Sequence, residues 1–262
     1  MIDKKLIKDI YPHRGPIFRF FWPFTHVLIT NFCVTLGYVY FHILNKTIVI
    51  GKENVPRGPN TLLMSNHQTM IDSFLIGLSV YYPESLIRPS LIPWNPAAEE
   101  NLYRNPIVGW LSDNWKCIPV KRGRKDVSMI FKIGRALKTS PLLLFPEGTR
   151  SRDGEIKKGR GGSGLMILES RPKVIPICID GMHRILPIGS MFPGLFKRIY
   201  IYYGKEVDLS EFENVEKNRE SAQNVIDKVM TEIRALKSEI VEMQRLEKHP
   251  ESAGEPKGVD SL

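Results

Sequence analysis

The sequence predicts an α/β fold in which helices flank a central sheet, and three observations support this. Residues 61–64 form a short apolar run of strand type, followed by a polar turn and by a run of helical character at 74–78. Residues 141–145 form a second strand-like run that ends in a glycine turn. A length of 262 residues fits one such domain with appendages. In open α/β sheets the chemistry usually lies where a strand passes through a turn into a helix.

The same patterns predict the order of elements and three regions. An N-terminal membrane-anchoring helical region covers 1–46, an α/β domain covers 47–248, and a disordered tail rich in Pro, Gly and charge covers 249–262. Within the domain, the hydrophobic spacing predicts strands at 47–51, 174–177 and 198–203, and helices at 127–137, around 165–168 and at 215–248. The apolar stripe of the last helix indicates packing on the domain.

The N-terminal region contains the longest uncharged segment. Residues 20–44 include no Asp, Glu, Lys or Arg, which is long enough to cross a bilayer. Pro23, Asn31 and Gly37 interrupt the segment, aromatic residues lie at both ends, and bases flank both sides, so the charge bias gives no orientation. The pattern favours a monotopic anchor lying in one leaflet over a true span, with a buried core helix as a third possibility.

The net charge indicates the class of partner, and the cysteines indicate the redox environment. The formal net charge of +9 indicates an anionic partner, and the absence of a recognised nucleic-acid motif favours lipid over nucleic acid. Cys33, Cys117 and Cys178 are scattered in apolar surroundings, which predicts reduced thiols in a protein that faces the cytoplasm.

The first candidate motif places His67 five residues before Asp72. On one continuous helix these positions would lie about 140° apart, so the side chains can meet only if His67 precedes the helix. Thr69 is a good N-cap, which would put Asp72 at the third helical position, where an acid suits the helix dipole. An aspartate beside a histidine fixes its tautomer and stabilises its protonated form. A helix-capping aspartate near an unrelated turn histidine is the structural alternative.

The second candidate motif follows the strand-like run at 141–145. Gly148 permits an unusual backbone angle or close approach of a ligand, and Arg150 can bind a phosphate through two hydrogen bonds. An ion pair between Glu147 and Arg150 that merely closes the loop remains the alternative here.

Together these segments resemble the H-x-x-x-x-D and F-P-E-G-T-R-S blocks of the glycerolipid acyltransferases, the 1-acylglycerol-3-phosphate acyltransferase family. Residues 117–122 resemble the block whose final arginine binds the acceptor phosphate, and residues 174–177 resemble the fourth, apolar block. The resemblance runs from about Ile50 to Lys205 and implies a mixed central sheet flanked by helices, similar to the glycerol-3-phosphate acyltransferases.

Several positions depart from the family pattern. Lys116, Pro119 and Lys121 stand where the second block usually has glycine, a bulky apolar residue and aspartate. Glu99 and Glu100 replace lysines of a connecting segment. The resemblance therefore supports the type of reaction more firmly than the identity of the acceptor.

The resemblance implies that His67, oriented by Asp72, takes the proton from a glycerol hydroxyl of the acceptor. The oxygen then attacks the thioester of an acyl-CoA or acyl carrier protein, and no cofactor, metal or covalent acyl-enzyme is needed. Arg150, Arg122 and Lys121 are expected to hold the acceptor phosphate.

The remaining residues of the second motif complete the expected substrate site. Gly148 and Thr149 belong to its binding turn, and Glu147 is expected to orient Arg150 or to bind an acceptor hydroxyl. The expected acceptor is lysophosphatidic acid, and the expected product is phosphatidic acid, made in phospholipid biosynthesis at a membrane with the catalytic domain on the cytoplasmic side.

Other functions stay open. One is acyl transfer to lysophospholipids with larger head groups, similar to cardiolipin-remodelling relatives, and another is a non-catalytic protein that binds lipid surfaces. A metal-dependent phosphohydrolase would need more ligands than His67 and Asp72, and His42 and His183 lack suitably spaced partners.

Overall fold

The computed structural model describes residues 4–121, 127–190 and 192–248. At its centre is a five-stranded sheet of order β1-β7-β6-β2-β5, formed by β1 (Lys46–Ile50), β2 (Thr61–Ser65), β5 (Leu142–Leu144), β6 (Lys173–Asp180) and β7 (Arg198–Tyr203). Neighbouring strands run parallel except β6 and β7, which run antiparallel. The predicted mixed sheet is thus confirmed. The predicted tail at 249–262 lies outside the described residues.

A second, two-stranded sheet extends the first. It pairs β3 (Asn95–Ala98) with β4 (Cys117–Val120) in parallel, and a parallel bridge between Trp94 and Leu142 joins it to β5. β2, β5, β3 and β4 therefore share one direction, so the residues that directly follow them lie at one common edge.

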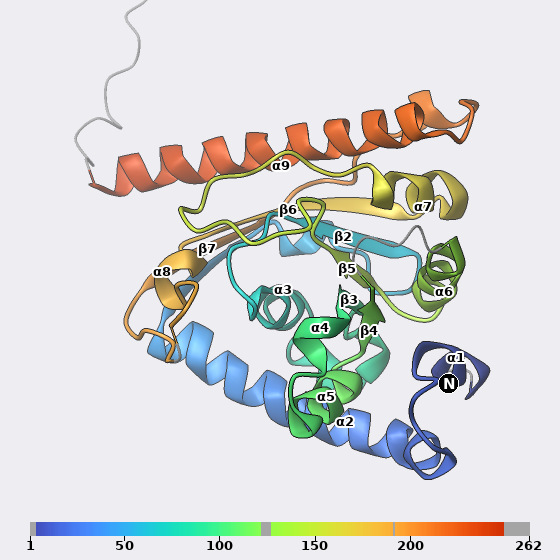
Figure 1. The fold of residues 1–262 in the computed structure, drawn as a ribbon. Coiled ribbons are helices and arrows are strands. Elements are labelled where there is room, and N and C mark those ends of the chain that lie inside the picture. Colours follow the sequence, from blue (N-terminus) through green and yellow to red (C-terminus); the bar gives the residue numbers. More distant parts are fainter. Residues whose placement is uncertain (1–3, 122–126, 191, 249–262) are drawn as a thin grey trace, which may run out of the picture.

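Helices cover both faces of the main sheet. α7 (Gly162–Ser170) and α9 (Arg219–Lys248) lie across one face, and α3 (Asp72–Tyr81) lies on the other (Figure 1). The remaining helices are α1 (Lys4–Ile10), α2 (Pro16–Tyr38), α4 (Glu99–Leu102), α5 (Pro106–Asn114), α6 (Val127–Leu137) and α8 (Met182–Ile185). Short 3₁₀ turns occur at Lys52–Asn54, Glu84–Leu86, Pro89–Leu91 and Ser210–Phe212.

The core has two layers, one on each face of the sheet. Successive side chains of a strand point to opposite faces, so Leu62 and Met64 of β2 join the layer under α9 while Leu63 joins the layer over α3. All five residues of β2 are buried. A strand buried on both faces is expected to be continuously apolar rather than alternating, as the 61–64 run is.

The last helix packs on the domain as its apolar stripe predicts. Val225, Val229, Ile233 and Ile240 of α9 are fully buried against the sheet. The helix begins at Arg219 rather than at 215, because the side chain of Asn218 accepts a hydrogen bond from the backbone of Ser221 and caps it.

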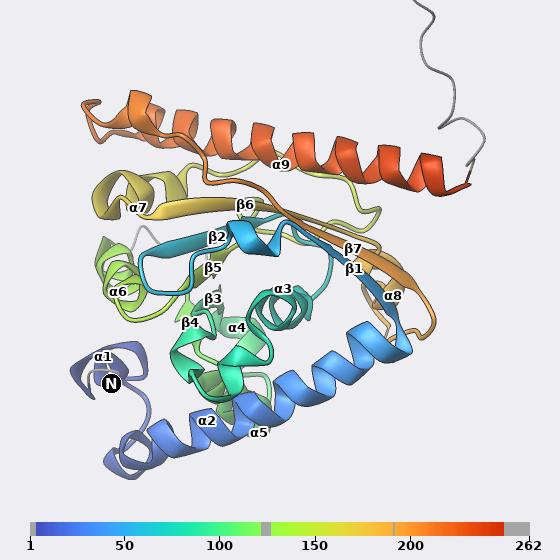
Figure 2. The ribbon, with the colours of Figure 1, turned by 180° about the vertical axis from the view of Figure 1, so that it is seen from behind.

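The N-terminal apolar segment forms one long helix along the underside of the domain, beside α3 and α5 (Figures 1 and 2). α2 continues through a π-helical stretch, Val39–Leu44, and the 29 residues of Pro16–Leu44 are long and apolar enough to cross a membrane by length and composition alone. Protein covers one side, where Trp22, His26, Thr30 and Val34 are buried. The opposite side exposes Ile17, Phe20, Phe21, Phe24, Leu28, Phe32, Leu36, Val39 and Ile43.

Candidate active site

His67 and Asp72 meet in the turn between β2 and α3. Nδ1 of His67 lies 2.9 Å from Oδ2 of Asp72, whose side chain has no exposed surface. An ionised carboxylate only accepts hydrogen bonds, so this contact puts the imidazole proton on Nδ1 and leaves the lone pair on Nε2. The ring also stacks on Phe145 with centroids 3.9 Å apart, and 19% of the His67 side chain remains exposed. The pair is therefore held rigidly with a basic nitrogen available.

The hydrogen bonds of the turn between β2 and α3 differ from those that the sequence predicts. α3 begins at Asp72, so Thr69 is not its N-cap and Asp72 is not at the third helical position. The Asp72 carboxylate instead folds back and accepts from the backbone amides of Gln68 at 2.6 Å and Thr69 at 2.8 Å, and from the Thr69 hydroxyl at 2.6 Å. These bonds close the turn before the helix starts and fix the carboxylate under His67.

Glu147 holds the two motifs together. Its carboxylate accepts from the backbone amide of His67 and from that of Lys157, both at 3.1 Å. The amide of Ser151 donates to the carbonyl of His67 at 2.7 Å, so the loop after β5 bonds to both the backbone amide and the carbonyl of the histidine. Burial raises the pKa of Glu147 and the two amides oppose this rise. Among the described residues Glu147 makes no hydrogen bond or ion pair with Arg150, so the expected direct contact between them is not found, and its binding of an acceptor hydroxyl stays a prediction.

The rest of the second motif forms a tight turn. Gly148 has φ of +66°, a left-handed conformation that favours glycine. Thr149 and Arg150 are half-buried, and the carbonyl of Arg150 accepts from Nζ of Lys157 at 2.9 Å. Among the described residues no hydrogen bond or ion pair engages the Arg150 guanidinium. This cation belongs to the turn that follows β5, at the edge that carries His67.

The comparisons with known proteins agree with this arrangement. A sequence profile of the Acyltransferase family matches residues 46–180, just over half of the chain. The chain belongs to the Acyltransferase family. The chloroplast 1-acyl-sn-glycerol-3-phosphate acyltransferase of Brassica napus is 28% identical over 175 residues, 63% of this chain and 47% of that protein.

Two further similar proteins are a curated sequence and a solved structure. The N-acylphosphatidylethanolamine synthase of Arabidopsis thaliana is 30% identical over 137 residues, which are 50% of this chain and 48% of that protein. The acyltransferase chain thus spans about half the length of these curated relatives. The crystal structure of the 1-acyl-sn-glycerophosphate acyltransferase from Thermotoga maritima gives a TM-score of 0.57 at 23% identity over 80% of each chain. That likeness concerns the fold.

The other predicted phosphate ligands of this acyltransferase follow β4. Nζ of Lys121 lies 3.9 Å from Oε2 of Glu99, the first residue after β3. Both β3 and β4 end at the edge that carries His67, so a mixed-charge pair borders the site. Arg122 lies outside the described residues, and its predicted role stays a prediction.

Lys116 occupies a backbone conformation suited to glycine. Its φ is +58°, and its side chain is completely buried. The ammonium donates to the carbonyl of Ile92 at 2.7 Å and the hydroxyl of Ser140 at 2.8 Å and lies over the ring of Trp94. Burial lowers the pKa of this amine to about 7. The departure from glycine therefore places a buried cation where no carboxylate pairs with it among the described residues.

Two amide side chains beside His67 were not singled out from the sequence. Asn66 donates to the carbonyl of Ile179 at 2.9 Å and accepts from its amide at 2.8 Å, which ties the histidine turn to β6. Gln68 donates to the same carbonyl at 3.1 Å and accepts from the amide of His183 at 3.1 Å. The sequence shows only that Asn and Gln flank this histidine. Their hydrogen-bond partners lie over 110 residues away, so the sequence does not reveal these contacts.

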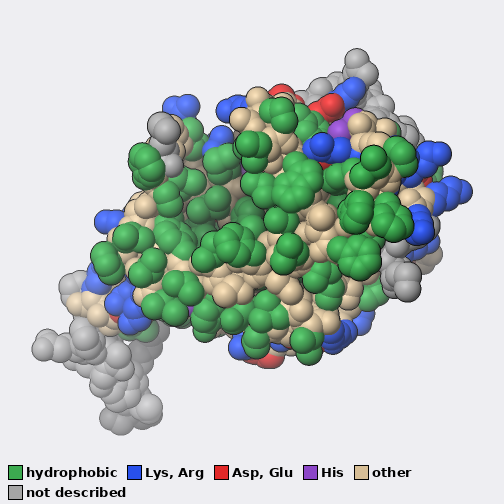
Figure 3. All heavy atoms as spheres, turned by 90° about the horizontal axis from the view of Figure 1, so that it is seen from below, with side chains coloured by type: hydrophobic (Ala, Val, Ile, Leu, Met, Phe, Trp, Pro, Cys, Tyr) green, Lys and Arg blue, Asp and Glu red, His purple; other side chains and the backbone are tan. Residues whose placement is uncertain are grey.

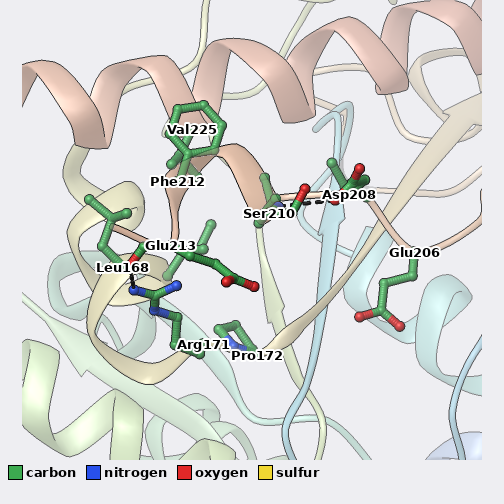
Figure 4. A pocket seen from close by; sticks show the side chains of 12 residues that line it. Leu168, Arg171, Pro172, Glu206, Asp208, Ser210, Phe212, Glu213 and Val225 are labelled. Atoms are coloured by element: carbon green, nitrogen blue, oxygen red, sulfur yellow. Dashed lines mark hydrogen bonds between the residues drawn. The ribbon is translucent and has the colours of Figure 1, made fainter. Parts of the chain in front are cut away.

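A cavity of about 450 Å³ lies away from this edge. It is lined by residues that precede β6 and follow β7, including Arg171, Glu206, Asp208 and Glu213 (Figure 4). Because β6 runs parallel to β2, its start lies at the opposite edge from His67. Among the described residues no three His, Cys, Asp or Glu side chains gather closely enough to hold a metal ion.

Proposed function

We propose that this acyltransferase moves a fatty acyl chain from an acyl thioester to the sn-2 hydroxyl of 1-acylglycerol-3-phosphate and so makes phosphatidic acid for phospholipid biosynthesis. The contact between His67 Nδ1 and the buried Asp72 carboxylate, at 2.9 Å, carries the proposal. It leaves Nε2 as a general base on a turn at the sheet edge. The name of the Brassica napus relative supports this choice of acceptor.

In the proposed reaction, Nε2 of His67 removes the proton of the acceptor hydroxyl as the oxygen attacks the thioester carbonyl. Asp72 stabilises the imidazolium that forms. The tetrahedral oxyanion collapses to the ester and expels the thiolate, which takes the proton back from Nε2 and leaves as the free thiol. General-base catalysis of this kind contributes about 10²–10⁴-fold, and no covalent acyl-enzyme is required.

Arg150 is the proposed main ligand of the acceptor phosphate. Its guanidinium makes no hydrogen bond or ion pair with the residues that the structure describes, and a guanidinium matches two phosphate oxygens at once. Gly148 and Thr149 form the turn beside it, and Lys121 and Arg122 come after β4 of the small sheet in the sequence. Glu147 acts indirectly in this scheme, because its hydrogen bonds to the amides of His67 and Lys157 hold the general base and the phosphate turn together.

The proposed membrane anchor is α2, lying in one leaflet with the catalytic domain on the cytoplasmic side. A helix that crossed the bilayer would be surrounded by lipid, whereas α2 turns one side to the domain along its length. Two polar side chains on that side bond to the domain: Nδ1 of His26 lies 2.9 Å from the carbonyl of Asn114, and Thr25 donates to the Asn114 side chain at 2.6 Å. The apolar groups face outward, as in helices that lie in the membrane interface.

Acceptors with a larger head group are the second candidate. The ion pair of Lys121 with Glu99 puts a carboxylate beside a proposed phosphate ligand, and a carboxylate favours an acceptor that carries an ammonium group beyond its phosphate. The relative named N-acylphosphatidylethanolamine synthase is consistent with such variation.

One assay separates these candidates. The purified protein in detergent is given an acyl-CoA, or an acyl carrier protein thioester, with a panel of lysophosphatidic acid, lysophosphatidylethanolamine, lysophosphatidylcholine and lysocardiolipin. The proposal predicts the highest kcat/KM for lysophosphatidic acid. A clear preference for a larger head group would replace it with the second candidate, and no transfer to any acceptor would leave a lipid-binding protein.

A further inference from the structure

The segment between α8 and β7 exposes aromatic side chains to an unusual degree. Phe192 and Phe196 are 80% and 83% exposed, and Leu195 and Ile188 are 43% and 39% exposed. Single exposed apolar residues are normal on a protein surface, but several in one short loop mark a contact with another apolar phase.

This exposure belongs to a built projection. The amide of Gly194 donates to the carbonyl of Ile185 at 2.7 Å, which closes the loop, and the amide of Phe196 donates to the carbonyl of Leu44 at 3.1 Å. Phe196 has φ of +57°, a conformation that disfavours a bulky side chain. The backbone thus holds a phenylalanine outward at a position where glycine would be easier.

The loop is tied to the far end of the proposed anchor helix. Tyr40 donates its hydroxyl to the carbonyl of Gly194 at 2.6 Å, and the side chain of Asn45 accepts from the amide of Lys197 at 2.9 Å. In Figure 1 the loop after α8 descends beside the end of α2. Its apolar tip therefore adjoins the exposed Val39 and Ile43 of the helical segment.

Charge identifies the partner. From residue 181 to residue 197 the chain contains no Asp or Glu, while Arg184 and Lys197 are cationic. The underside of the molecule is covered largely by hydrophobic side chains, with Lys and Arg around its rim (Figure 3). Aromatic tips beside bases match the boundary between acyl chains and anionic head groups.

We propose that residues 188–190 and 192–196 form a second membrane-inserting element, in which Phe192 and Phe196 enter the same leaflet as α2 and Lys197 meets anionic head groups. The inference rests on the proposed membrane association of this acyltransferase. A helix lying in the interface leaves the domain free to roll about its axis, and a second point of insertion restricts that motion.

The test uses the full-length double variant F192S/F196S and flotation with vesicles of phosphatidylcholine, with and without phosphatidylglycerol. We expect its vesicle partition coefficient to fall about tenfold or more, since each phenylalanine loses an apolar contact. The matched control V241S changes a side chain that is 50% exposed on α9, across the sheet from α2, and should leave partition unchanged.

Two further measurements make the result specific. The double variant should keep the thermal melting temperature and its turnover of a monomeric short-chain acceptor, because neither phenylalanine is among the proposed catalytic or phosphate-binding residues. In F196W, the added fluorescence should be quenched by brominated lipids. Unchanged partition of the double variant, or an added tryptophan that brominated lipids do not quench, would overturn the proposal. Loss of turnover with acyl-CoA at unchanged partition would assign the loop to the donor instead. Vesicle binding is measured without substrate, so absence of acyl transfer would disprove the proposed function alone.

Discussion

Two completely buried aspartates illustrate different uses of the same group. Asp72 takes its hydrogen bonds from its own turn, namely from His67, Gln68 and Thr69. Asp113 on α5 takes most of its bonds from the N-terminal region nearly 100 residues earlier: its carboxylate accepts from Arg14 at 2.7 Å, and its carbonyl from Trp22 at 2.9 Å.

The difference lies in what remains open after the bonds are made. Beside Asp72, the histidine keeps a free ring nitrogen and part of its surface. Around Asp113, Tyr103 and Tyr11 complete a hydrogen-bonded cluster that fastens the N-terminal region to α5. Asp72 thus pairs with a histidine whose second ring nitrogen can take up a proton, whereas Asp113 pairs with Arg14, whose guanidinium cannot act as a base, and joins two segments of the chain.

The largest expected effect concerns His67, the partner of Asp72. His67→Ala should lower kcat by about 10²–10⁴-fold, because the general base is lost. Vesicle flotation of the same variant should match the unmodified protein, since α2 is unaltered. Turnover that persists in His67→Ala would remove the proposed role of the pair.

For the Asp113 cluster we expect a substitution to lower stability rather than catalytic activity. Asp113→Ala should lower the free energy of unfolding by about 3–5 kcal/mol, the usual result of removing one partner of a buried ion pair. Urea unfolding measures it, with Asp208→Ala as a control at an exposed aspartate. A midpoint equal to that of the control variant would mean that the cluster does not fasten the anchor.

Arg150 tests whether the catalytic edge holds an anion. Arg150→Ala should raise KM for lysophosphatidic acid about 10–100-fold, the equivalent of losing a charge-assisted contact of about 1.5–3 kcal/mol. Arg150→Lys should recover only part of this, because an ammonium lacks the two-point geometry. Arg245→Ala removes an exposed guanidinium on α9 and is expected to leave KM unchanged. Equal KM in all three variants would place the phosphate elsewhere.

Lys116 is a third buried charge, with neutral hydrogen-bond partners, and it predicts a pH effect. Its pKa is about 7 in the folded chain against 10.5 for an ordinary lysine, so between these values the unfolded chain binds the extra proton and stability rises with pH. Lys116→Met removes this term. The unfolding free energy of the unmodified protein minus that of Lys116→Met should therefore rise by up to about 1.4 kcal/mol per pH unit above pH 7. Parallel stability curves would contradict the buried amine.

The comparison also explains what the sequence can reveal. The contact of His67 with Asp72 is local, so the spacing shows that the two side chains can meet in the turn before the helix, and β2 and β5 are recognisable as apolar runs. β3 consists of Asn95-Pro96-Ala97-Ala98, residues with little strand preference, and forms only because it pairs with β4 and adjoins β5. The small sheet therefore could not be predicted.

Long-range contacts account for the remaining differences. Glu147 was expected to serve Arg150, but its partners are backbone amides of His67 and Lys157, and backbone groups leave no trace in a sequence. The residue type and place of Thr69 suit an N-cap. In the structure its hydroxyl donates to the carboxylate of Asp72 instead, and the helix begins only at Asp72. The Asp113 cluster joins segments that share no pattern.

The most direct test of the account is the kcat of Asp72→Asn, a change that keeps the shape of the side chain and removes its charge. With lysophosphatidic acid and an acyl-CoA in detergent, kcat should fall by at least about 10²-fold, because the neutral amide no longer holds His67 in the basic tautomer or stabilises its protonated form. A kcat close to that of the unmodified enzyme would show that the pair does not carry the reaction.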